Sequence, residues 1–184
     1  MPEYLRLIQP GGTFFFTVVT YNRLPIFDSP SARELLGDAF RSAMERYPFT
    51  MDPICLLPDH LHCILTLPET DGDCSIRWGY IKSYFTRRFK GTNEVTPNLN
   101  KSREIRREGS VWQRRFWEHI IVDDFDFERH FDYIHYNPVK HGLVNNVEDW
   151  KWSSFNRYVE LGWYPRRWEH EEDGKNMVGT EYLD

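Results

Sequence analysis

Residues 13–20 read Thr-Phe-Phe-Phe-Thr-Val-Val-Thr, a run of aromatic and β-branched side chains that follows directly after Gly11-Gly12. Such a run is typical of a strand that is mostly buried. Two more strand-like stretches, Ile54–Leu57 and Leu61–Leu67, lie on either side of Pro58-Asp59. Proline disfavours the middle of a strand, so Pro58-Asp59 predicts a turn between two strands.

Helical patterns follow the first and third of these strands. Residues 31–34, Ser-Ala-Arg-Glu, have the form of a capping box, and apolar residues then recur at helical spacing until Pro48. Ser75 is placed to cap a second helix over residues 76–90. Residues 91–110 are polar and contain several helix breakers, so they predict a loop.

A third helix is predicted from Asp123 or Asp124 to about Tyr136. It ends there because the residue before a proline avoids helical angles, and residues 137–138 are Asn-Pro. The remaining predicted elements are a strand at Val111–Ile121 and a short helix at Trp152–Tyr158. The order β-α-β-β-α-β-α favours an α/β (α+β) fold, with a central antiparallel sheet and helices on one of its faces.

The composition favours one compact cytoplasmic domain. The chain has 184 residues, of which 40% are hydrophobic, and this length suits a single core. No stretch approaches the roughly 18 apolar residues of a membrane span, and the first residues lack the basic end and apolar core of a signal peptide. Cys55, Cys63 and Cys74 are an odd number without close pairing, as expected of reduced thiols in a cytoplasm.

Charge is distributed unevenly along the chain. Residues 77–115 carry 11 basic and 3 acidic side chains, whereas residues 1–76 carry 5 and 10, and residues 116–184 carry 7 and 15. Aromatic residues are interleaved with the basic ones in the middle segment. This mixture suits single-stranded or distorted nucleic acid, because cations contact phosphates and rings stack on bases. From charge alone, a solvated basic helix and loop fits equally well.

His60 and His62 are the first candidates for chemistry. Residues two apart on a strand share a face, so the two imidazoles project side by side while Leu61 points to the core. Two imidazoles in this arrangement can converge on one cation, although they need at least one further ligand. A bare His-x-His pair is also compatible with two histidines on a solvated face.

Tyr133 and Asn137 are the second candidates. On a helical wheel Phe127, Phe131 and Ile134 form a narrow apolar stripe that predicts the buried face. Tyr133 and Asn137 lie on a polar flank beside this stripe, four residues and therefore one helical turn apart. Periodicity alone does not separate a catalytic tyrosine from one that fills the core.

Several segments together resemble a known enzyme family. Residues 58–65, Pro-Asp-His-Leu-His-Cys-Ile-Leu, resemble the His-hydrophobic-His motif of single-tyrosine HUH transposases. Residues 111–119 (Val-Trp-Gln-Arg-Arg-Phe-Trp-Glu-His) and 133–142 (Tyr-Ile-His-Tyr-Asn-Pro-Val-Lys-His-Gly) resemble, more narrowly, the REP-associated tyrosine transposases, as do residues 11–18 and 152–155. The similarity extends over about residues 4–168, and the order and spacing of the segments make it specific.

The resemblance implies a ferredoxin-like sheet with HUH endonuclease architecture, in one catalytic domain over residues 1–168. Residues 169–184 are then an acidic, flexible tail. It also implies a metal-dependent endonuclease and strand transferase for single-stranded DNA. The family's targets are hairpins of bacterial repeated extragenic palindromes (REP), and the reaction passes through a covalent 5′-phosphotyrosine.

The resemblance implies specific roles for the candidate residues. His60 and His62 would be metal ligands, Tyr133 the nucleophile, and Asn137 would occupy the position of the family's third, polar ligand. Mg²⁺ or Mn²⁺ is the expected ion, although imidazole ligands alone suit Zn²⁺ equally, and no organic cofactor is expected. The expected DNA contacts are Arg77, Lys82, Arg87, Arg88, Arg114 and Arg115.

The expected partner is a single-stranded DNA hairpin, with no membrane, and the expected location is the bacterial cytoplasm at the nucleoid. The protein would act as a monomer or a homodimer. Two alternatives stay open from the sequence. One is a zinc hydrolase that uses a water bound by His60 and His62, with activity independent of Tyr133. The other is a non-catalytic DNA-hairpin-binding protein on the same scaffold.

Overall fold

A four-stranded antiparallel sheet forms the centre of the protein, in a computed structural model that describes residues 8–89 and 111–168. Its strands are β1 (Thr13–Val19), β2 (Thr50–Leu56), β3 (His60–Thr66) and β4 (Trp117–Ile120), in the order β2-β3-β1-β4. With the helices between them this is the β-α-β-β-α-β arrangement of ferredoxin-like domains, as predicted. The predicted loop at 91–110 and the tail at 169–184 lie outside the described residues.

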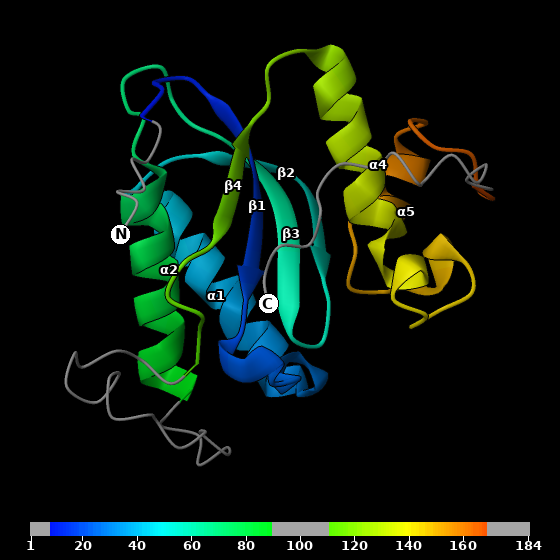
Figure 1. The fold of residues 1–184 in the computed structure, drawn as a ribbon, viewed down its shortest axis with the longest axis horizontal. Coiled ribbons are helices and arrows are strands. Elements are labelled where there is room, and N and C mark those ends of the chain that lie inside the picture. Colours follow the sequence, from blue (N-terminus) through cyan, green and yellow to red (C-terminus); the bar gives the residue numbers. More distant parts are fainter. Residues whose placement is uncertain (1–7, 90–110, 169–184) are drawn as a thin grey trace.

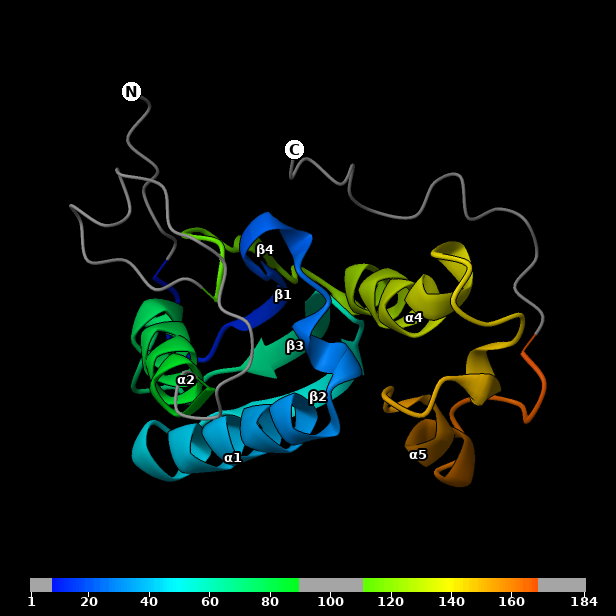
Figure 2. The same cartoon turned by 90° about the horizontal axis from the view of Figure 1, so that it is seen from below.

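Helices cover both faces of the sheet. They are α1 (Pro30–Arg46), α2 (Cys74–Phe89), α4 (Asp124–Lys140) and the short α5 (Phe155–Glu160), with 3-10 turns at Tyr21–Arg23, Ile26–Asp28 and Val147–Asp149. The helices α1 and α2 pack on one face, and α4 packs on the other (Figures 1 and 2). The prediction that helices occupy a single face is therefore wrong.

The strand β1 explains why both faces need cover. Its side chains alternate, so Phe14 and Phe16 enter the core formed with α1 and α2, whereas Phe15 enters a smaller core with Ile134 of α4. All three phenylalanines are at most 2% exposed. The prediction of a buried strand at residues 13–20 is confirmed, and a strand buried on both faces requires two layers of helices.

The boundaries of several elements differ from the predictions. Ser29, rather than Ser31, precedes α1, and Pro30 is the first helical residue. Asp73 caps α2, because its carboxylate accepts hydrogen bonds from the backbone N–H groups of Ser75 and Ile76. The predicted capping box and the Ser75 cap are therefore wrong. In both cases a neighbouring residue, proline or aspartate, starts the helix better.

Pro138 does not end α4, which continues to Lys140. A proline removes only its own backbone N–H donor. Pro138 lies in the last turn of α4, and the residues after it still donate their backbone hydrogen bonds. The N–H of His141 donates to the carbonyl of Asn137, and the N–H of Leu143 donates to that of Pro138. Asn137 consequently stays on the helix, one full turn after Tyr133.

The last strand is shorter than the predicted Val111–Ile121. Only β4, Trp117–Ile120, pairs along β1, and Trp112 makes one isolated bridge to Thr20. Arg114 and Arg115 lie between these two contacts, and they are exposed and outside the strand. The strand β2 is longer than predicted, because it tolerates Pro53 at an irregularity on the sheet edge.

His135 joins α4 to the segment that follows it. Its ring is fully buried, with Nε2 2.8 Å from Ser154 Oγ and Nδ1 3.3 Å from the Tyr164 hydroxyl. Ser154 also donates to the carbonyl of Ile54 at the outer edge of β2. His135 is therefore part of the packing between α4 and β2, on the opposite side of the helix from the candidate nucleophile.

We expect this histidine to make the fold sensitive to acid. Burial lowers the pKa of His135 to about 3, against about 6.5 in an unfolded chain. Below pH 6.5 the unfolded state therefore binds a proton that the folded state does not, and stability falls as the pH falls. His135→Gln is expected to reduce the loss of unfolding free energy between pH 7 and pH 5 by about 2 kcal/mol. Urea unfolding at both pH values measures it.

Asn156→Ala, which changes an exposed side chain on α5 and removes no titratable group, supplies the control for this experiment. It should leave the pH dependence of the unfolding free energy close to that of the wild type. An equal pH dependence in His135→Gln and the wild type would contradict the role given to burial.

Candidate active site

His60 and His62 lie side by side on the face of β3 that α4 covers. The centroids of their rings are 4.9 Å apart, and the two residues are only 3% and 1% exposed. Between them Leu61 points into the opposite core. The predicted pairing of the two imidazoles on one face is thus present, on a buried surface rather than a solvated one.

Each imidazole is oriented through its Nδ1 atom. His60 Nδ1 lies 2.5 Å from Asp59 Oδ1, and His62 Nδ1 lies 2.8 Å from the hydroxyl of Thr17, which is its register partner on β1. Arg23 in turn contacts the Asp59 carboxylate at 3.3 Å. Metal-binding histidines commonly hold their second ring nitrogen in this way, which leaves Nε2 available as a ligand.

Tyr133 reaches the histidine pair from α4. The centroid of its ring lies 5.2 Å from that of His62 and 5.8 Å from that of Phe15, and the residue is 4% exposed. The helix crosses the sheet so that the polar flank of its wheel, rather than the apolar stripe alone, faces the end of β3. The structure therefore brings together the two groups of candidates, which are about seventy residues apart in the chain.

Asn137 lies one turn beyond Tyr133 and is fully buried. Both of its side-chain polar atoms lack a hydrogen-bond partner, and so does the buried Nε2 of His62. Leaving one such atom unsatisfied costs about 1–3 kcal/mol. A buried imidazole nitrogen and an amide oxygen are donors that a divalent cation accepts, and Asn137 lies one helical turn from Tyr133, whose ring contacts His62, so these residue types fit a divalent cation.

The charge state of His62 also suits a ligand. Burial, followed by electrostatic repulsion from the neighbouring His60, His141 and Lys140, holds the pKa of His62 well below its usual value. The ring is consequently neutral at pH 7, and its lone pair is not blocked by a proton. The hydrogen bond from His60 and the charge of Arg23 outweigh the effect of burial on Asp59, so the pKa of that carboxyl is lowered and it stays ionised.

Lys140 and His141, which follow Pro138, also face the site, and neither was predicted to belong to it. The Lys140 ammonium lies 4.9 Å from the centroid of the Tyr133 ring, and the His141 ring lies 5.2 Å from that of His60. Lys140 is seven residues after Tyr133, which is two helical turns, so helical spacing would have found it. The role of Thr17 depends on strand register, which the sequence does not reveal.

Arg77 is not placed to contact DNA. It is fully buried, donates to the carbonyls of Asp73 and Pro48, and pairs with Asp71 at 2.8 Å. These contacts tie the start of α2 to the end of α1. We therefore leave Arg77 out of the proposed DNA surface, because a buried guanidinium with three protein partners has no free face for a phosphate.

The other basic candidates are accessible, at least in part. Arg87 and Arg88 are exposed on the last turns of α2, where the Arg88 guanidinium stacks 3.5 Å above the Tyr84 ring. Lys82 is half-buried and donates to the carbonyl of Gln113. The exposed residues Arg114 and Arg115 lie on the same connecting segment as Gln113. Trp112 and Phe116, in contrast, are buried in the larger core.

Within the described ranges, 8–89 and 111–168, no helix has the length and apolar character needed to span a membrane.

Comparisons with known proteins point to one family. The family model described as "Transposase IS200 like" matches residues 13–137, which include the histidine pair, Tyr133 and Asn137. A Haemophilus influenzae protein whose name assigns it to the REP-associated tyrosine transposases is 43% identical, over 95% of this chain and 97% of its own length. The "REP-associated tyrosine transposase" of Escherichia coli K12 is 40% identical, over 91% of each chain.

A solved structure agrees with these sequence matches. It is described as "Structure of the REP associates tyrosine transposase bound to a REP hairpin", and it superposes with a TM-score of 0.77 at 39% identity, covering 93% of each chain. Membership of this transposase family suggests the use of a divalent metal, and the described residues include His and Asp side chains that could hold one. The chain belongs to the IS200-like transposase family and, within it, to the REP-associated tyrosine transposases, enzymes that cleave DNA and transfer its strands.

Proposed function

We propose that this protein cleaves and rejoins single-stranded DNA at REP-type hairpins, with Tyr133 as the nucleophile and a divalent cation held by His60, His62 and Asn137. The observation that carries the proposal is the position of the Tyr133 ring, 5.2 Å from a His62 whose buried Nε2 has no partner. The hairpin substrate is supported by the relative of known structure, whose description names a REP hairpin. The catalytic domain is taken to be residues 1–168.

The chain's own residues supply the nucleophile and its orientation. The Tyr133 oxygen attacks the scissile phosphorus and loses its proton, and a bond forms between that oxygen and phosphorus. The bond from phosphorus to the 3′ oxygen breaks, and the departing strand takes up a proton as a 3′-hydroxyl. His60, His62 and Asn137 would hold a Mg²⁺ or Mn²⁺ ion, which would polarise the phosphate and stabilise its developing charge when bound. The Lys140 ammonium, beside the Tyr133 ring, adds positive charge where the phosphate must lie.

The covalent link explains strand transfer. A 5′-phosphotyrosine retains the energy of the phosphodiester bond, so another 3′-hydroxyl can attack it and rejoin the strands without ATP. One protomer contains all four proposed groups, His60, His62, Tyr133 and Asn137. Cleavage should therefore not require a second chain, and we expect its rate per protein molecule to be independent of protein concentration.

A denaturing gel tests the proposal directly. The protein is mixed with an end-labelled REP-type hairpin and Mn²⁺ or Mg²⁺, then boiled in detergent. We expect a slower, protease-sensitive band, which disappears with a chelator and in His62→Gln. Cleavage without any protein-linked product would instead favour hydrolysis by water at a zinc centre. Hairpin binding with no cleavage under any metal would favour the non-catalytic alternative.

The proposed DNA surface consists of Lys82, Arg87, Arg88, Arg114 and Arg115. Each phosphate contact on a single strand contributes about 0.7 to the slope of log affinity against log salt. The double variant Arg114→Ala, Arg115→Ala is therefore expected to reduce that slope by about 1.4. Fluorescence anisotropy with a labelled hairpin at several salt concentrations measures it.

Arg41 provides the comparison, because it is an exposed arginine on α1, paired with Asp38. Arg41→Ala should leave the salt slope unchanged. If the double variant and Arg41→Ala have the same slope as the wild type, Arg114 and Arg115 are not phosphate contacts.

A further inference from the structure

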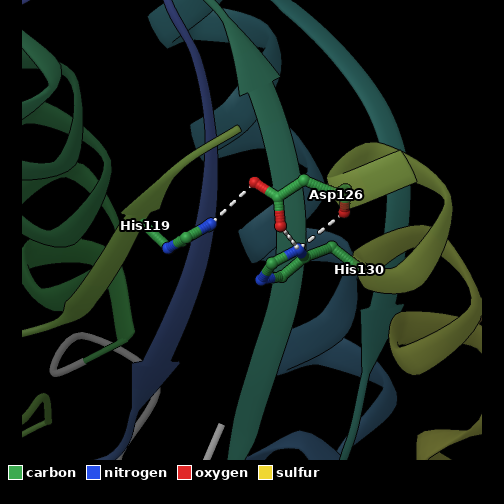
Figure 3. A group of neighbouring side chains, drawn as sticks. All are labelled: His119, Asp126 and His130. Carbon is green, nitrogen blue, oxygen red and sulfur yellow. Dashed lines mark hydrogen bonds and ion pairs between the residues drawn. The ribbon is translucent and has the colours of Figure 1, made fainter. Parts of the chain in front are cut away.

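A second group of metal-ligand side chains lies on the same face of the sheet as the active site. It consists of His119 on β4 and of Asp126 and His130 on the first turns of α4 (Figure 3). One ligand atom from each side chain lies within 4.8 Å of the others. The group is separate from the His60–His62 pair, because the Phe15 ring lies between His130 and His62, with centroids 4.7 and 5.7 Å away.

The Asp126 carboxylate joins the two imidazoles. Its Oδ2 lies 2.8 Å from His119 Nε2, and its Oδ1 lies 3.1 Å from His130 Nδ1. The rings of His119 and His130 lie beside one another, with centroids 4.6 Å apart. The three side chains thus converge from two elements, a strand and a helix, that the chain connects by a short turn at residues 121–123.

His130 also has a buried ring nitrogen without a hydrogen-bond partner. Its Nδ1 donates to the backbone carbonyl of Asp126 at 2.8 Å, and since a carbonyl only accepts, the proton must be on Nδ1. The lone pair is then on Nε2, which is buried and has no hydrogen-bond partner, and the residue as a whole is 0% exposed. A backbone carbonyl that fixes the tautomer in this way is the usual second contact of a metal-binding histidine.

The protonation states of two of the three side chains match what a cation requires. Burial lowers the pKa of His130, so the ring is neutral at pH 7. For Asp126 the hydrogen bonds from His119 and from the Val122 backbone outweigh burial and lower the pKa, so the carboxylate is ionised. His130 and Asp126 are thus in the forms that bind a metal, whereas His119 must first give up the Nε2 proton that it donates to Asp126.

We propose that His119, Asp126 and His130 bind one transition-metal ion of the Zn²⁺ class, and that this ion ties β4 to the start of α4. Two nitrogen ligands and one carboxylate oxygen suit Zn²⁺, whereas Mg²⁺ prefers six oxygens. The side chain of His119 is 34% exposed, which provides a route for the ion and room for a water as fourth ligand. The His119–Asp126 contact must widen only to about 3.3 Å around bonds of about 2.0 Å.

The site lies where it would position the nucleophile. Tyr133 is three residues after His130, one turn further along the same helix. An ion shared by β4 and α4 would therefore hold the helix that carries Tyr133 against the sheet. It would not contact the substrate, because Phe15 separates it from His62.

A cobalt titration of the full chain tests the site, with no DNA present. Co²⁺ at a four-coordinate site of nitrogen and oxygen ligands gives a visible absorption band. We expect this band in the wild type and in His62→Gln, which alters only the active centre. His119→Gln should weaken Co²⁺ binding at this site at least about tenfold. Glu118→Gln, a change at the neighbouring residue of β4, should bind like the wild type.

Thermal unfolding gives a second measurement that does not depend on a spectrum. Zn²⁺ at about 100 times its dissociation constant is expected to raise the unfolding temperature of the wild type by about 5–10 °C. The rise should persist in His62→Gln and disappear in the double variant His62→Gln, His119→Gln, and circular dichroism is used to check that each variant is folded. Unchanged Co²⁺ binding in His119→Gln, or loss of the band in His62→Gln instead, would overturn the proposal.

Discussion

Tyr133→Phe is expected to abolish the covalent protein–DNA adduct while hairpin binding persists. The substitution removes only the phenolic oxygen, and the ring keeps its contacts with His62 and Phe15. Without that oxygen no phosphotyrosine can form at this position, so the adduct should fall to the background of the assay. The denaturing gel measures the adduct, and anisotropy with the same hairpin measures binding.

Tyr136 is the matched control for this variant. It is on the same helix, three residues later, and it is half-buried with its ring against Trp168. Tyr136→Phe should form the adduct at the wild-type level. If Tyr133→Phe still formed an adduct and Tyr136→Phe did not, the nucleophile would be assigned to the wrong tyrosine.

Asn137→Ala is expected to make the protein more stable and at the same time inactive. In the absence of metal the wild type buries an amide whose oxygen and nitrogen have no partner. Removing them eliminates that cost and replaces asparagine by a better helix former, so the unfolding free energy in chelator should rise by about 1–2 kcal/mol. Metal-dependent cleavage should be lost, because the third ligand is gone. Urea unfolding and the cleavage gel measure the two effects.

Two further variants separate these effects. Asn156→Ala changes an exposed asparagine on α5 and should neither stabilise the protein nor alter cleavage. Asn137→Asp keeps an oxygen at the ligand position, and we expect it to retain metal-dependent cleavage in part. A less stable Asn137→Ala protein with normal cleavage would show that Asn137 is a structural residue and not a ligand.

These two experiments depend on a juxtaposition that local patterns could only suggest. Alternation along β3 predicts that His60 and His62 share a face, and the wheel of α4 predicts that Tyr133 and Asn137 share another. Both predictions concern residues within one element. The 5.2 Å between the Tyr133 and His62 rings depends on how α4 crosses the sheet, which no spacing in the chain specifies.

The sequence was least informative about charged and capping residues. Arg77 belongs to the most basic segment of the chain, yet it is buried because its helix packs against α1 and presents that position to the carbonyl of Pro48. Ser31 and Ser75 have the right residue type for caps, but the helices begin at Pro30 and Cys74. Neighbouring residues compete for the position before the first helical residue, and the choice between them decides where a helix begins. The helix stability at stake is a few tenths of a kcal/mol to about 2 kcal/mol.

By itself the sequence determined the order of the elements, the shared face of the two imidazoles and membership of an enzyme family, because periodicity and motif order are properties of short stretches. Only the tertiary structure decided that α4 covers the face opposite to α1 and α2, and that Lys140 and Thr17 join the active site. It also placed His119 beside Asp126 and His130. The physical reason is that the direction in which a helix packs follows from burying apolar surface across the whole sheet.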